Sequence, residues 1–166
     1  MNLRLLPTIV TAIALLPATP AAARDALGVF ESWGAFRDAQ PARCFAIAEP
    51  ARGGGGGRWR PFASVATWPG HNVRGQLHIR MSREIASNTP ITLAIGERNF
   101  QLVGGGADAW APDARADATI VAAMRSATSM SISARSRTGG GFADTYALRG
   151  AATAIDAATL GCARQR

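Results

Sequence analysis

Two histidines, His71 and His78, are the side chains best suited to acid–base chemistry or metal binding, because imidazole titrates near neutral pH. His71 follows Pro69-Gly70 and is expected in a turn. His78 alternates with apolar neighbours in an extended segment, so it is expected on the polar face of a strand. Their separation matches no zinc-ligand spacing. We therefore predict no metal site, no cofactor and no catalysis centred on histidine.

Carboxylates offer a second kind of chemistry. Glu84 and Glu97 lie nearest the predicted central strands, and a glycosidase needs two such groups at a defined separation across a cleft. Nothing in the sequence places them opposite one another, and solvated surface positions are the simpler reading. The sequence also contains no nucleophile elbow, no zinc-protease histidine pair and no phosphate-binding P-loop. The prediction is that the protein is not an enzyme and has no catalytic residues.

Tryptophan and arginine gather in predicted loops, where stacking and charge could bind a sugar or an anionic lipid. The predicted binding residues are Arg58, Trp59, Arg60, Trp68, His71 and Arg74. The alternative is that these tryptophans close the ends of a β core.

Arginine supplies all 18 basic residues and gives a net charge of +7. Such a surface would attract anionic glycolipid such as lipopolysaccharide. A lysine-free chain rich in alanine and glycine is also what GC-rich coding sequence tends to produce. The arginines are scattered along the chain, and no nucleic-acid partner is predicted.

The amino terminus carries the parts of a secretory signal peptide. Arg4 precedes an apolar run from Leu5 to Leu16, and Ala21-Ala22-Ala23 offers a cleavage site, so residues 1–23 are predicted to be removed. The apolar run is about a dozen residues long, whereas a helix needs roughly 20 to cross a bilayer. We predict a periplasmic or secreted protein without a transmembrane segment.

Only two cysteines occur, Cys44 and Cys162. An oxidising compartment favours a disulfide between them, which would close nearly the whole domain. Two separate buried thiols are the alternative.

The elements that must position these residues are mostly short strands between glycine-rich turns. Gly53–Gly57 is expected to be a flexible loop because no helix or strand interior tolerates five successive glycines cheaply. The predicted extended segments are 27–36, 43–48, 62–68, 76–81, 91–95, 99–103, 129–134 and 143–148.

Two helices are predicted. One covers about 117–126, with Asp117 as its cap, and the other about 150–161. In the second, Ala151, Ile155, Ala158 and Cys162 form one apolar face, which would place Cys162 on the buried side. Residues 24–166 are thus expected to form a single mostly β domain, a β-sandwich or open barrel with two short helices.

The sequence resembles the invasion-associated locus B family of alphaproteobacterial envelope proteins. The resemblance rests on Trp33 placed ahead of Cys44, on the run 120–125 (IVAAMR) and on the run 146–155 (YALRGAATAI), within about 27–48 and 117–162. It implies an exported, β-sandwich-like protein, linked in its family to host-cell invasion or envelope function, with no established catalytic residues. Family members often carry an additional cysteine pair, which this chain lacks.

These features together predict a non-catalytic exported protein that binds an envelope or host protein, or protects the envelope. Two alternatives stay open. The first is an inhibitor of a periplasmic or host hydrolase, which would present the loop Trp68–Arg74. The second is a protein that binds an anionic polymer such as lipopolysaccharide.

Overall fold

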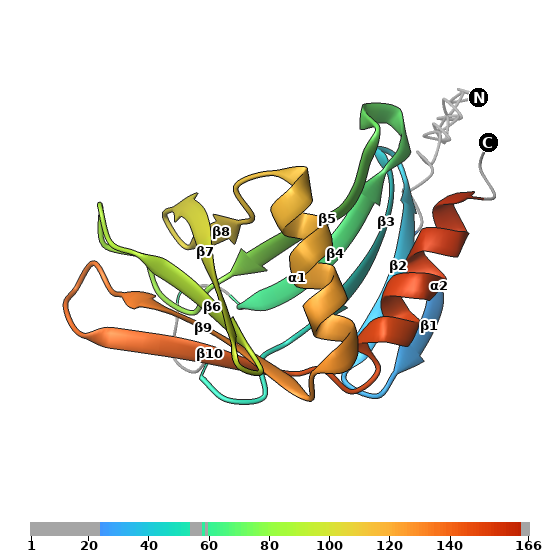
Figure 1. The fold of residues 1–166 in the computed structure, drawn as a ribbon. Helices are drawn as coiled ribbons and strands as arrows, with labels where there is room; N and C mark the ends of the chain where they lie inside the picture. Colours follow the sequence, from blue (N-terminus) through green and yellow to red (C-terminus); the bar gives the residue numbers. More distant parts are fainter. Residues whose placement is uncertain (1–23, 54–57, 59, 164–166) are drawn as a thin grey trace, which may run out of the picture.

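The computed structural model describes residues 24–53, 58 and 60–163 (Figure 1). The predicted signal peptide, most of the Gly53–Gly57 loop and Trp59 lie outside the described residues. Within the described part, no helix is long and apolar enough to span a membrane.

Ten antiparallel strands form one sheet in the order β1-β2-β3-β4-β5-β8-β7-β6-β9-β10. The strands are β1 Arg24–Phe30, β2 Trp33–Ala39, β3 Ala42–Ala48, β4 Phe62–Trp68, β5 Val73–Arg80, β6 Ile91–Ile95, β7 Arg98–Gly105, β8 Asp108–Trp110, β9 Ser129–Arg135 and β10 Gly141–Ala147. The helices are α1 Ala114–Ser126 and α2 Ala151–Ala163, with a short 3₁₀ turn, η1, at Pro69–His71. The sheet is not closed, because β1 and β10 lie at its two ends. The prediction of a mostly β domain with two short helices is confirmed. Of the two predicted architectures, the open barrel describes this sheet.

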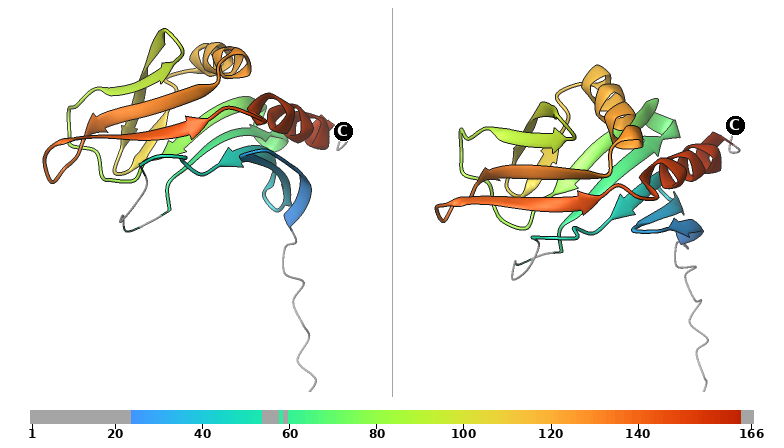
Figure 2. Two further views of the ribbon diagram at one scale, coloured as in Figure 1. Left: turned by 90° about the horizontal axis from the view of Figure 1, so that it is seen from below. Right: turned by 60° about the horizontal axis from the view of Figure 1, so that its bottom comes forward.

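Both helices lie against the inner side of the curved sheet, as Figures 1 and 2 show. Helix α1 packs on β5, and α2 packs across β1, β2 and β3. Along β5 and β9, apolar side chains on the inner face alternate with polar side chains on the outer face. Leu77 and Ile79 of β5 and Met130 and Ile132 of β9 follow this predicted alternation and are all buried. One continuous apolar core therefore joins the sheet to both helices.

Small residues allow α2 to approach the sheet closely. Ala35 and Ala46 on the inner face of β2 and β3 are fully buried, as are Ala151 and Ala154 of the helix. The predicted apolar face of this helix is confirmed. Its last member, Cys162, is bonded to Cys44 of β3 in the predicted disulfide, which spans 118 residues.

The segment predicted as one strand over 27–36 forms two. Strands β1 and β2 pair as a hairpin, and the chain reverses at Glu31 and Ser32. Glu31 adopts a left-handed conformation with φ 54°. Glu31 is not one of the residues that usually adopt this conformation, namely glycine, asparagine and aspartate, so Ser32 is the one turn signal that the sequence offers here.

Helix α1 begins earlier than predicted. Its cap is Asp113, whose carboxylate accepts a hydrogen bond from the amide of Ala116 at 2.7 Å. The predicted cap, Asp117, lies buried in the first turn and accepts from the backbone N–H of Leu77 at 2.8 Å. Strand β8 pairs with β5 only from His78 onward, so the carboxylate of Asp117 supplies the acceptor that β8 does not offer to Leu77.

Burial raises the pKa of the Asp117 carboxyl, which the hydrogen bond from Leu77 only partly offsets. When folding raises the pKa of a carboxyl, its contribution to the free energy of unfolding is fully present below the pKa of the unfolded chain, about 3.9. That contribution is lost as the pH rises through the pKa of the folded state. Asp117→Asn keeps an oxygen acceptor without the charge. We expect its free energy of unfolding at pH 7 to equal or exceed that of the wild type.

Asp117→Ala should instead lower the free energy of unfolding by about 1–3 kcal/mol, because the buried N–H of Leu77 loses its partner. Urea unfolding of both variants at pH 4 and pH 7 measures the difference. An Asn variant as unstable as the Ala variant at pH 7 would mean that the charge, rather than the acceptor, supports β5.

Candidate functional site

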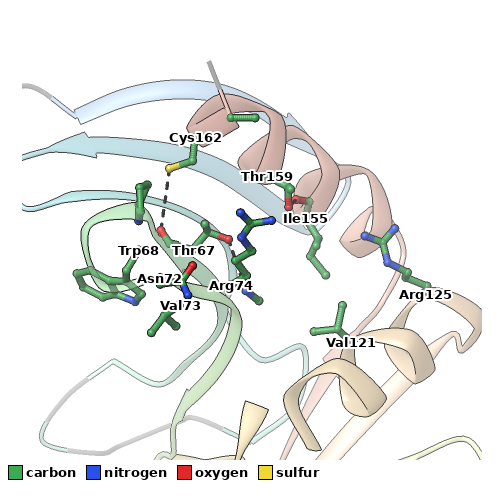
Figure 3. A pocket seen from close by; sticks show the side chains of 13 residues that line it. Thr67, Trp68, Asn72, Val73, Arg74, Val121, Arg125, Ile155, Thr159 and Cys162 are labelled. Atoms are coloured by element: carbon green, nitrogen blue, oxygen red, sulfur yellow. Dashed lines mark hydrogen bonds between the residues drawn. The ribbon is translucent and has the colours of Figure 1, made fainter. Parts of the chain in front are cut away.

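A cleft of about 360 Å³ lies between the β4–β5 hairpin and the two helices (Figure 3). Apolar side chains from three elements line it: Val73 of β5, Val121 of α1 and Ile155 of α2. Cys162, and with it the disulfide to Cys44, borders the same space. The cleft therefore has an apolar wall that the disulfide between α2 and β3 borders.

Local geometry brings these side chains together. The hairpin reverses through η1, where the N–H of Asn72 bonds the carbonyl of Pro69 at 3.3 Å and Asn72 itself adopts a left-handed conformation. Strand β5 then starts directly beside the cleft. Val121 and Arg125 lie one turn apart on α1, as do Ile155 and Thr159 on α2, so each pair faces the same side of its helix.

Two arginines give the cleft its charge, but only one is neutralised. Arg125 donates two hydrogen bonds, of 3.1 and 2.6 Å, to the carboxylate of Asp156. This pairing raises the pKa of Arg125 and lowers the pKa of Asp156. Arg74 extends into the cleft (Figure 3) and has no hydrogen bond or ion pair with the described residues. The described lining contains no acidic side chain.

Trp68 borders the cleft, but its indole belongs to a stack on the outer face of the sheet. The guanidinium of Arg43 lies 5.2 Å from the indole centroid and 4.6 Å from that of Phe45. Asp38 neutralises this arginine at 2.8 Å and also binds Arg24 at 2.8 Å. The hydrogen bond from Arg24, with that from Arg43, outweighs partial burial and lowers the pKa of Asp38. This stack has its charges satisfied internally.

The predicted binding residues separate into two places. Trp68, His71 and Arg74 come together at the β4–β5 hairpin, where the rings of Trp68 and His71 lie 6.4 Å apart. Arg58 and Arg60 precede β4 and therefore lie at its other end. There Arg60 forms an exposed ion pair with Glu49 at 3.0 Å. It borders a second, more open hollow on the outer face, lined by Val29, Phe36, Ile47 and Phe62.

His78 is partly exposed on the outer face of β5, as predicted, and it has a carboxylate partner that the sequence did not reveal. Its Nε2 lies 2.8 Å from an oxygen of Asp108, and its ring stacks on Trp110 at 4.9 Å. Burial opposes ionisation of Asp108, but hydrogen bonds from Arg80 and His78 prevail and lower its pKa. The nearby Ser64 hydroxyl donates to the His78 carbonyl rather than to the ring. The geometry is that of an Arg80–Asp108 ion pair to which the His78 ring is hydrogen-bonded, beside the rings of Phe62 and Trp110.

The two glutamates weighed as a catalytic pair are apart. Glu84 forms an ion pair with Arg137, and Glu97 lies in the turn between β6 and β7. No group of three histidine, cysteine, aspartate or glutamate side chains among the described residues is arranged to hold a metal ion.

The helical half of the cleft has no signature in the sequence. Val121 lies half-buried at the cleft, although its apolar type and its place beside the buried Ile120 would suit the core equally well. Nothing local distinguishes Arg125 and Thr159 from surface residues. Their place follows only from the way α1 and α2 meet across the sheet.

The fold is similar to the crystal structure of invasion associated protein B from Bartonella henselae. The two chains share 16% sequence identity with a TM-score of 0.59, and the alignment covers 84% of this chain and 98% of that one. At this identity the likeness is one of fold, and to that extent it confirms the resemblance noted in the sequence. No protein-family model matches the sequence, and no curated protein matches it.

Proposed function

We propose that this chain, which has the fold of invasion associated protein B, is an exported, non-catalytic binding protein of the bacterial envelope. It holds its partner at the cleft between the β4–β5 hairpin, α1 and α2. The observation that carries the proposal is an apolar cleft that contains an arginine, Arg74, without an acidic partner in the described part of the chain. An unpaired guanidinium beside apolar side chains suits a ligand that carries both an anionic group and an apolar group.

Export is supported by the apolar amino terminus and by the disulfide, since disulfides persist in oxidising compartments. We expect the protein recovered from the envelope after expression of the full coding sequence to begin at Arg24. Mass spectrometry of the intact protein and of its amino-terminal peptide measures this. Recovery of the uncut chain from the cytoplasm would contradict it.

A non-catalytic role is supported by the composition of the cleft. Its polar side chains are mainly the hydroxyls of Thr67 and Thr159 and the amide of Asn72, beside the two guanidinium groups. None of these is a general base, and the hydroxyl of Thr159 is bonded to the carbonyl of Ile155 at 2.8 Å. Nucleophilic catalysis needs a hydroxyl or thiol activated by a neighbouring base. Binding is the function that this set of groups serves best.

A cleft-filling substitution tests the proposal. Val121→Trp should fill the space between the helices and the hairpin, while Val103→Trp places the same side chain at an exposed position of β7 (52% exposed). Each oxidised protein is immobilised and exposed to an envelope extract of the native organism, and retained molecules are identified by mass spectrometry. We expect one component to be retained by the wild type and by Val103→Trp and lost by Val121→Trp. Equal retention by all three would exclude the cleft as the binding site.

A second candidate is favoured by the β4–β5 hairpin, which extends beyond the neighbouring β2–β3 hairpin at the top of Figure 1. Its tip is held by the turn at Pro69 and Asn72, and the side chain of His71 is exposed there. Loops held on a rigid scaffold commonly carry binding residues, and a fixed, protruding one suits the inhibition of a hydrolase. Inhibition lost in His71→Ala but kept in Val121→Trp would support the inhibitor and count against the cleft.

A further inference from the structure

We propose that the cleft binds a single-chain anionic amphiphile, that is, one acyl chain ending in a carboxylate or a phosphate. This inference rests on the proposed function and names its ligand class. Arg74 receives the anionic end, and the apolar wall formed by Val73, Val121 and Ile155 receives the chain.

The anionic end is specified by Arg74. A guanidinium presents several N–H donors in a planar fork that suits both carboxylate and phosphate oxygens. Thr67 stands beside it in the lining, and the oxygen of its hydroxyl lies 3.5 Å from the N–H of Gly75, so the hydroxyl proton stays available to a ligand oxygen. The site thus offers donors of two kinds at one place.

Competing charge is removed from the same region. Asp156 is the carboxylate closest in sequence to Ile155, and two hydrogen bonds from Arg125 hold it. An incoming anion therefore meets the free charge of Arg74 without an unpaired carboxylate in the described lining.

The apolar wall and the volume of the cleft indicate the kind of acyl group that fits. A volume of about 360 Å³ lies near the lower limit for small-molecule sites, which is roughly 300 Å³. One chain fits such a space better than the several chains of a complete lipid. The disulfide and α2 back this wall, so the site is preformed rather than assembled by the ligand.

Calorimetric titration of the oxidised protein with decanoate, decyl phosphate and 1-decanol, each below its aggregation concentration, tests the inference. We expect both anions to bind at least about tenfold more tightly than the neutral alcohol, as one charge-assisted hydrogen-bonded contact requires. Shortening decanoate by one methylene should weaken binding about fourfold. Comparing the two anions distinguishes a fatty acid from a phosphate-bearing lipid.

Matched variants locate the binding. Arg74→Gln should reduce the affinity for decanoate to that for 1-decanol, whereas Arg98→Gln, at the start of β7, should leave it unchanged. Val121→Trp should abolish binding of both ligands, and Val103→Trp should not. Circular dichroism and thermal unfolding confirm that each variant is folded.

Two outcomes would overturn the inference. The first is no binding of decanoate or decyl phosphate to the wild type. The second is an affinity for decanoate that Arg74→Gln does not change. In either case, an envelope component that Val121→Trp still fails to retain would leave the proposed function standing with another kind of ligand.

Discussion

Removing the disulfide is expected to lower the free energy of unfolding by about 4–5 kcal/mol. The bond joins Cys44 to Cys162 across 118 residues, so it restricts most of the unfolded chain. In the chain-entropy model, a loop of about 100 residues corresponds to roughly 4.7 kcal/mol. The double variant Cys44→Ala, Cys162→Ala is the suitable test, because both sulfur atoms are buried and serine would bury two hydroxyls. Urea unfolding of the oxidised wild type and of the double variant measures the loss.

Reduced wild-type protein provides the control. It has the same core side chains as the oxidised protein, so its stability should fall close to that of the double variant. Coincident unfolding curves for the oxidised protein and the double variant would show that packing of α2 alone fixes the helix on β3.

Gly150→Ala is expected to lower the free energy of unfolding by at least about 3 kcal/mol, since two separate costs combine. Gly150 has φ +85°, a conformation that L side chains rarely adopt, just before α2 begins. A Cβ atom there would lie 1.9 Å from the carbonyl oxygen of Phe30 and 2.6 Å from its carbon. Because both neighbours are backbone atoms, the turn between β1 and β2 or the start of α2 must move.

Gly96→Ala separates the two costs. Gly96 also has a positive φ, of +58°, but a Cβ atom there meets nothing within 4 Å. The free energy of unfolding of Gly96→Ala should therefore fall only by the conformational cost, about 1–2 kcal/mol. Thermal or urea unfolding of the two variants gives the comparison. Equal losses would mean that the contact with Phe30 costs nothing.

The sequence predicted those parts of the fold that depend on local periodicity. Alternation placed Leu77, Ile79, Met130 and Ile132 in the core, and the spacing along α2 placed Cys162 on its buried side. The start of α1 was missed because Asp113 and Asp117 can both cap a helix. Asp117 is taken up by the N–H of Leu77 because β8 ends before it reaches that residue. This depends on the tertiary structure and not on the local sequence.

The candidate site was predicted only in part, for a related reason. Trp68, His71 and Arg74 are near one another in sequence and remain so in space. Arg60 is also near in sequence, but it precedes β4 and Trp68 lies at the far end of that strand. The six steps from Phe62 to Trp68 span roughly 20 Å at about 3.3 Å per residue. The contributions of α1 and α2 come from distant segments, which no local pattern can bring to β5.

The last helix covers the first strands, and this has a consequence for the order of folding. Ribosomes produce the chain from its amino end, so β1, β2 and β3 are complete long before α2 exists. Until then the apolar inner face around Trp33 and Ala46 lacks its cover. Contacts between the two ends of a chain give high contact order, which is associated with folding in milliseconds to seconds rather than microseconds. A chain that ends before residue 151 would therefore leave this apolar face without its cover.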